Sequence, residues 1–254
     1  MPRPMGTPST TVKKEGPPGS SSCHCPATSA ILLKAVMAVT GLILFGFVIV
    51  HALGNLLVFL PEDAINGYGY FLHHAGVHGL LLIWPFRLFL LAAAVAHIVA
   101  AIILTKRNRA ARPVPYAKMN ANGATLASRT MFVGGLVLAV FIVFHILQFT
   151  VEAGPFAGTK SYETQVPGIV GNVHDVHRMM VHAFRNVWIS GFYLVSVAFL
   201  GLHLYHGSAA LFRSLGLGNR ATFPWQDFIA RAFGAFTFLA MAAIPLAILF
   251  GIVK

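Results

Sequence analysis

Five long apolar stretches, separated by more polar segments, dominate the pattern of hydrophobic and polar positions along the chain. Each stretch is long enough to cross a bilayer as an α-helix, which needs about 20 apolar residues. The pattern therefore predicts an all-α protein, a five-helix transmembrane bundle whose termini lie on opposite sides of the membrane. The predicted spans run from about Ile31 to Leu60, Gly79 to Thr105, Thr130 to Val151, Val187 to Phe212 and Phe228 to Val253.

The remaining segments divide the chain into a short tail and one membrane domain. Residues 1–29 are rich in Pro, Gly, Ser and Thr, which is typical of a disordered tail, and residues 30–254 form the membrane domain. We expect residues 61–78 to form a polar loop. Near the end of the loop 152–186, apolar residues at helical spacing predict a short interfacial helix between His174 and Asn186.

Composition and charge agree with a protein of the inner (cytoplasmic) membrane. Hydrophobic residues make up 57% of the chain and charged residues only 10%. The net charge of +11 lies in loops without interleaved aromatic residues, so we expect the lipid bilayer and no nucleic acid as a partner. Of the 18 lysines and arginines, 13 lie in the tail through Lys34 and in the segments 106–129 and 212–231. The positive-inside rule then predicts a cytoplasmic N-terminus.

Four of the five predicted spans contain a histidine within their apolar run, namely His51, His97, His145 and His203. An ionisable side chain inside a membrane is costly and marks a functional site. Counted from the nearest basic residue at the cytoplasmic edge, His51 and His145 lie about 25 and 24 Å deep, and His97 and His203 about 13 and 15 Å. The four histidines therefore form two pairs at two depths.

Two imidazoles that face each other across a bundle are the axial ligands of a six-coordinate b-type haem. We therefore predict two b-type haems, one held by His51 and His145 and the other by His97 and His203. Any one of these histidines alone is more often a structural, hydrogen-bonded residue, so the prediction rests on their joint arrangement. His206 is an alternative to His203, although its depth matches that of His97 less well.

The residues around these histidines resemble a known family. Lys34–Phe59 reads KAVMAVTGLILFGFVIVHALGNLLVF, and Leu200–Gly216 reads LGLHLYHGSAALFRSLG. With His97 and His145, these stretches look like the cytochrome b membrane-anchor subunit of succinate dehydrogenases and fumarate reductases, in its single-polypeptide, five-helix, di-haem type. In that family the first ligand follows a Thr-Gly pair by ten residues, as His51 does here, and the fourth precedes a glycine by four, as His203 does.

The resemblance covers about residues 30–254 and implies a place in a respiratory enzyme. A flavoprotein subunit would interconvert succinate and fumarate, and an iron–sulfur subunit would pass the electrons. This chain would anchor both on the cytoplasmic side and exchange electrons with a quinone, so the dicarboxylate site would lie on another subunit. We expect menaquinone, because a second haem near the outer face lets the membrane potential assist an uphill electron transfer.

Several residues at the membrane edges are further candidates. Lys106 and Arg213 could contact haem propionates, although snorkelling to lipid headgroups is the usual role of such residues. Some members of the family have an acidic residue for quinol oxidation near the outer end of the second helix. In this chain the only acidic residues nearby are Glu62 and Asp63, early in the loop. Residues that could serve instead are Tyr68, His73, His74, His78 and Arg87.

Two other classes of protein remain open. A cytochrome b of the formate dehydrogenase or hydrogenase type would also bind haem, but it resembles a four-helix subunit with a different distribution of histidines. A haem-free transporter would use the intramembrane histidines for substrate or protons. Cys23-His24-Cys25 in the tail is not expected to bind a metal, because three consecutive residues do not readily wrap one ion.

Overall fold

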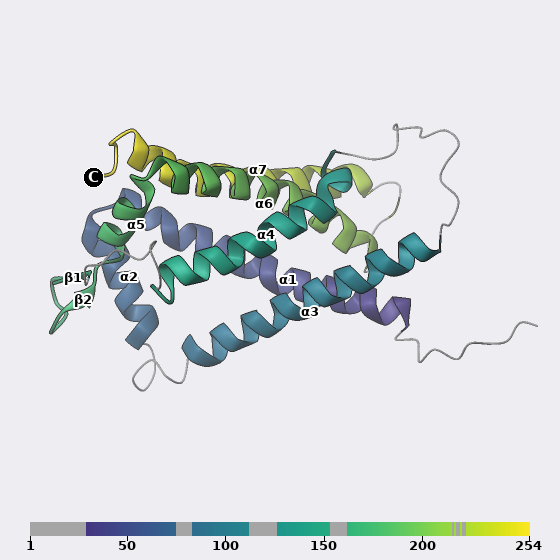
Figure 1. Cartoon of the computed structure of the whole chain (residues 1–254), viewed down its shortest axis with the longest axis horizontal. Coiled ribbons are helices and arrows are strands. Elements are labelled where there is room, and N and C mark those ends of the chain that lie inside the picture. The colour runs from purple at the N-terminus through teal and green to yellow at the C-terminus, as the bar shows by residue number, and fades with distance from the viewer. Residues whose placement is uncertain are drawn as a thin grey trace, which may run out of the picture.

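A computed structural model of the chain describes residues 29–74, 83–111, 126–152, 162–214, 216, 219 and 222–254, without the side chains of 126–129. Five described helices are long and apolar enough to cross a membrane, which confirms the all-α, five-helix bundle and a multi-pass membrane protein (Figure 1). They are α1 (Ala30–Asn55), α3 (Ile83–Ala110), α4 (Leu126–Phe149), α6 (Val187–Ser214) and α7 (Phe223–Leu249). Residues 1–28 of the predicted tail, with Cys23 and Cys25, lie outside the described residues.

The spanning helices form two groups that run alongside each other (Figure 1). One group is α1 packed along α3, and the other is α4 packed along α6, which also packs against α7. Backbone contact between the groups runs mainly from α1 to α6 and α7. The pairs α1 with α4 and α3 with α6 have almost no close backbone approach among the described residues, so side chains must connect them.

Glycines explain how closely α6 and α7 approach. A Cβ atom at Gly201 would lie 2.9 Å from the carbonyl oxygen of Gly234, and one at Gly234 would lie 2.6 Å from that of Gly201. Helices in membranes associate largely through such contacts between small residues, since lipid gives no hydrophobic driving force between them. The contact sets the position of α6, and with it that of His203.

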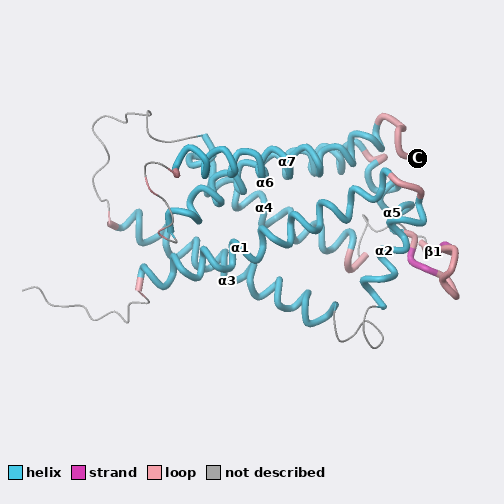
Figure 2. Tube along the Cα trace, turned by 180° about the vertical axis from the view of Figure 1, so that it is seen from behind, coloured by secondary structure: helices cyan, strands magenta, loops and turns pink. Residues whose placement is uncertain are grey.

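A small cap covers one end of the bundle, where the chain also ends (Figures 1 and 2). It comprises the 3₁₀ helix η1 (Leu56–Phe59), α2 (Glu62–His74), α5 (Val176–Phe184) and an antiparallel pair of short strands, β1 (Glu163–Thr164) and β2 (Val173–His174). The prediction of a polar loop over 61–78 was wrong, because residues 62–74 form α2. Acidic residues in the first turn of α2 and histidines in its last turn suit the helix dipole.

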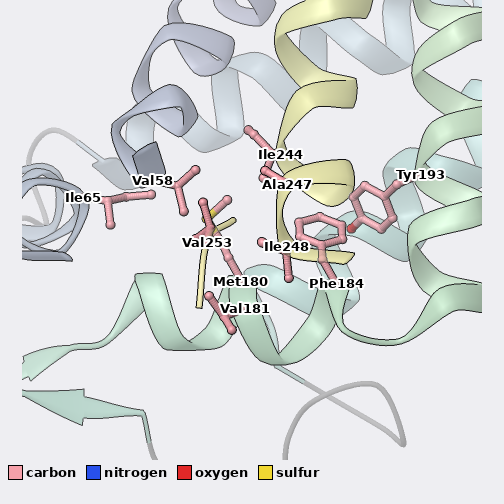
Figure 3. Close-up of a cluster of buried hydrophobic side chains, with 10 residues drawn as sticks. All are labelled: Val58, Ile65, Met180, Val181, Phe184, Tyr193, Ile244, Ala247, Ile248 and Val253. Carbon is pink, nitrogen blue, oxygen red and sulfur yellow. The ribbon is translucent and has the colours of Figure 1, made fainter. Parts of the chain in front are cut away.

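The predicted helix between His174 and Asn186 is confirmed as α5, and most of its residues are buried against the rest of the protein. Its residues Met180, Val181 and Phe184 are buried in an apolar core that joins the cap to the ends of α6 and α7 (Figure 3). The rest of that core consists of Val58, Ile65, Tyr193, Ile244, Ala247, Ile248 and Val253. Gly251 adopts a positive φ of 70°, which reverses the chain after α7 and returns Val253 to the core.

A buried amide fastens α2 to α5. Asn66 is fully buried, and its Nδ2 donates to Asp175 Oδ1 at 3.2 Å, while its Oδ1 accepts from the His177 backbone N–H at 2.9 Å. Asp175 also accepts from the Arg178 N–H and so caps α5. These bonds hold α2 and α5 in a fixed position relative to each other within the cap.

Candidate functional site

The four intramembrane histidines meet in two pairs. The ring centroids of His51 on α1 and His145 on α4 are 5.7 Å apart, with ring planes at 86°. Those of His97 on α3 and His203 on α6 are 6.3 Å apart, with ring planes at 63°. These are the partners that the depths along the spans predict, and each pair connects two helices whose backbones hardly touch. We call them the cap-side pair (His51, His145) and the far pair (His97, His203).

The two pairs lie at separate levels of the bundle. On α1, Thr40 contacts His97 and so marks the level of the far pair. His51 lies 11 residues after Thr40, a rise of about 16 Å. On α6, Tyr193 contacts His145 and so marks the level of the cap-side pair. His203 lies 10 residues after Tyr193, a rise of about 15 Å. Two independent helices thus give the same separation between the pairs.

The spacing within each pair suits a metal ion between two imidazoles. A metal–nitrogen bond to histidine is about 2 Å long, so rings on opposite sides of one ion have centres roughly 6 Å apart. Both observed spacings are close to this value. The described residues contain no group of three or more His, Cys, Asp or Glu side chains that could hold an ion.

Thr40 determines which nitrogen of His97 carries the proton. Its Oγ1 donates to the Val36 carbonyl oxygen at 2.6 Å, so towards His97 Nδ1, 3.2 Å away, it can only accept. The hydrogen of His97 is therefore on Nδ1, and the lone pair of Nε2 is available to a ligand. Gly41 makes this contact possible, because a Cβ there would lie 3.2 Å from His97 Cε1.

Tyr193 has the same relation to His145. Its hydroxyl donates to Gln148 Oε1 at 2.8 Å, so the same oxygen accepts from His145 Nδ1 at 3.1 Å. The lone pair of His145 Nε2 is then available as well. Histidines that bind metals usually donate their other N–H to such an acceptor, which orients the ring and raises its basicity.

The surroundings of the cap-side pair are apolar and aromatic. The ring of His51 stacks on Phe47 at 5.2 Å, and Phe141 and Phe149 contact His145 at 5.7 and 5.5 Å. A group bound between these imidazoles would have mainly apolar neighbours, which limit its access to water.

A narrow indentation between α4 and α6 reaches His203 of the far pair and is too small to hold a water molecule. It is lined by Thr130, Met131, Gly134, Phe199 and Leu202. The Nδ1 atom of His203 is buried and has no hydrogen-bond partner. His206 lies one turn further along α6 and is half-buried, and the ring that meets His97 is that of His203.

Lys106 and Arg213 lie away from the imidazoles. Both are exposed, and Arg213 Nε donates to the Ala209 carbonyl oxygen within its own helix. Lys106 lies about 13 Å along α3 from His97, and Arg213 about 15 Å along α6 from His203. They are therefore positioned beyond the far pair, at the end of the bundle opposite the cap.

The residues considered for quinol oxidation are only partly brought together. His73 Nε2 lies 3.4 Å from an Arg87 nitrogen, and His74 stacks on Tyr70 at 3.9 Å. Tyr68 packs instead against α1, where a Cβ at Gly54 would lie 2.7 Å from its ring. His78 lies outside the described residues.

Gln148 and Tyr193 are site residues that the sequence-based reasoning missed. Their signal in the sequence was a glutamine and a tyrosine within predicted spans, with Gln148 three residues after His145. Comparisons of the chain with protein-family models, with curated proteins and with solved structures gave no match.

Proposed function

We propose that this chain is the membrane-anchor and electron-transfer subunit of a succinate:quinone oxidoreductase, with one b-type haem at each histidine pair. The observation that carries the proposal is the meeting of four histidines from four helices as two pairs at two levels. The sequence around His51 and His203, which resembles that of the cytochrome b family, supports it, because both histidines belong to the observed pairs.

The donor set of each pair fits a haem. Each pair offers two imidazoles whose ring centroids are 5.7 Å or 6.3 Å apart, and a porphyrin would supply the remaining ligands of an iron held between them. When bound, haem iron carries one electron at a time by changing between its ferrous and ferric states. Thr40 and Tyr193 would hold the Nδ1 protons of His97 and His145, and the aromatic rings around the cap-side pair would exclude water there.

The two levels suggest a direction for electron transfer. With pairs about 15 Å apart along the helices, electrons would pass along the membrane normal between a partner at one face and a quinone, with menaquinone the favoured species. The basic end of the bundle beyond the far pair suits docking of an iron–sulfur subunit, itself bound to a flavoprotein. This arrangement corresponds to the inner membrane with a cytoplasmic N-terminus, and it makes the chain part of an enzyme whose dicarboxylate site is elsewhere.

Haem content and electron donor test the proposal together. The full chain, co-expressed with its flavoprotein and iron–sulfur partners and purified in detergent, should contain two b-type haems in a dithionite-reduced spectrum. Succinate should reduce at least one of them. A colourless protein would overturn the proposal, and reduction by formate or hydrogen but not succinate would move the chain to another respiratory dehydrogenase.

Surface histidines provide a matched control. His174→Ala and His73→Ala remove imidazoles from the cap, and both should keep two haems. His51→Ala should keep only one.

A further inference from the structure

The phenol of Tyr193 lies at the centre of a buried chain of two hydrogen bonds, which runs from His145 of the cap-side pair to Gln148. Tyr193 is 6% exposed and Gln148 is 3% exposed, so no bulk water competes for either group. The hydroxyl has one hydrogen, which it gives to Gln148 Oε1. What it offers His145 is therefore a lone pair, in a medium where such a bond is strong.

Packing fixes the ring that carries this hydroxyl. Tyr193 makes edge contacts with Phe184 at 4.9 Å and with Phe141 at 5.0 Å, and it belongs to the apolar core of the cap (Figure 3). Gln148 lies one turn after His145 on the same helix. The Tyr193 hydroxyl therefore cannot move away from His145 without disturbing the cap. The two hydrogen bonds are thus a fixed part of the fold.

Thr40 provides the equivalent acceptor at the far pair by a different route. Its hydrogen goes to the carbonyl oxygen four residues earlier in its own helix, a bond that a threonine in a helix makes readily. The oxygen then faces His97 across the α1–α3 contact. In each pair, one imidazole is thus bonded to a hydroxyl from the helix packed beside its own.

We propose that Tyr193 and Thr40 are positioning residues that set the proton position and the electron density of one iron ligand in each pair, Tyr193 for His145 and Thr40 for His97. The inference rests on the proposed function, since it assigns these residues to haem ligands. An imidazole that donates its N–H is a stronger electron donor to iron. A stronger donor favours the ferric state, so each hydroxyl lowers the reduction potential of its own haem and leaves the other unchanged.

Three variants of the full chain in its purified complex test this. Tyr193→Phe keeps the packed ring and removes the oxygen. Thr40→Val keeps the shape and removes the oxygen, whereas Thr40→Ser keeps the oxygen. A redox titration followed by haem absorbance measures both potentials in each variant, and the low-temperature electron paramagnetic resonance spectrum of the ferric haems reports ligand strength.

The expected results are specific to one haem at a time. Tyr193→Phe should raise the potential of one haem and shift its ferric resonance, Thr40→Val should do so for the other haem, and Thr40→Ser should behave as the native protein. Tyr205→Phe is the control, because it removes a phenol from the same helix whose hydroxyl donates to Asp227 instead. It should shift neither potential.

Several results would overturn the inference. They are unchanged potentials in Tyr193→Phe and Thr40→Val, equal shifts of both haems in either variant, or the same behaviour of Thr40→Val and Thr40→Ser. If the native protein nevertheless contains two haems, only this inference fails and the proposed function is still supported. A native protein without haem would overturn both. If Tyr193→Phe does not accumulate, the contrast between the two Thr40 variants decides the question.

Discussion

The imidazole ring centroids of His51 and His145 lie 5.7 Å apart, although the helices that carry them make almost no backbone contact among the described residues. The same holds for His97 and His203. The strongest backbone packing is within the groups α1–α3 and α4–α6–α7, and the histidine pairs cross from one group to the other. A group bound between the rings would therefore connect parts of the bundle that are otherwise joined less extensively.

Paired loss of haem follows from this arrangement. His51→Ala and His145→Ala should each remove the same haem, and His97→Ala and His203→Ala should each remove the other, because both histidines of a pair would be needed to hold its haem. The reduced absorbance spectrum and a haem assay measure the loss. His206→Ala is the control and should keep both haems. If His206→Ala loses a haem and His203→Ala does not, the ligand of the far pair is His206.

Haem should also stabilise the bundle. A ligand that binds only the folded state at 100 times its dissociation constant adds about 2.7 kcal/mol to the free energy of unfolding. Protein made in haem-deficient cells should therefore unfold at a lower temperature than the loaded protein, and adding haem should restore the difference. The double variant His51→Ala/His97→Ala is the control, since its melting temperature should not respond to haem. An equal response in both proteins would speak against binding at these pairs.

The sequence predicted the five spans and the histidine partners because both depend on regular quantities. A run of apolar residues has a minimum length for crossing a bilayer, and the rise of a helix converts residue number into depth. The cap was harder to predict. α2 contains Asn66, Gly67 and Gly69, which read as a loop, but the pairing of Asn66 with α5 and the burial of Ile65 stabilise a helix there.

The acceptors of the histidines could not be predicted for a similar reason. Thr40 and Tyr193 contact histidines on neighbouring helices, 57 and 48 residues away in the chain. Such contacts depend on the rotation of each helix about its axis, and the apolar pattern of a spanning helix says little about rotation because lipid and protein neighbours are equally apolar.

The crossing of α6 and α7 should be sensitive to one added carbon. Gly234→Ala would place a Cβ 2.6 Å from the Gly201 carbonyl oxygen, a backbone atom that cannot move aside alone. We expect a loss of about 1–3 kcal/mol in the free energy of unfolding, as for other overpacked sites. Gly46→Ala is the matched control, because a Cβ there meets nothing within 4 Å and alanine favours a helix by about 1 kcal/mol. Thermal unfolding in detergent should separate the two variants, and equal melting temperatures would show that the close approach is not limiting.

The cap should depend on Asn66 more than on any exposed amide. Asn66→Ala leaves the buried His177 N–H without its acceptor and Asp175 without one donor, and an unsatisfied buried group costs about 1–3 kcal/mol. Hydrogen exchange measured by mass spectrometry should show faster exchange in α2 and α5, with α3 and α4 unchanged, because the lost bonds join only the cap helices. Asn172→Ala is the control, since Asn172 is exposed and its bond to Glu163 lies at the surface, where substitutions change stability by about 0.5 kcal/mol or less. Uniform exchange in all helices of Asn66→Ala would mean that the cap and the bundle unfold as one unit, and that the amide stabilises both.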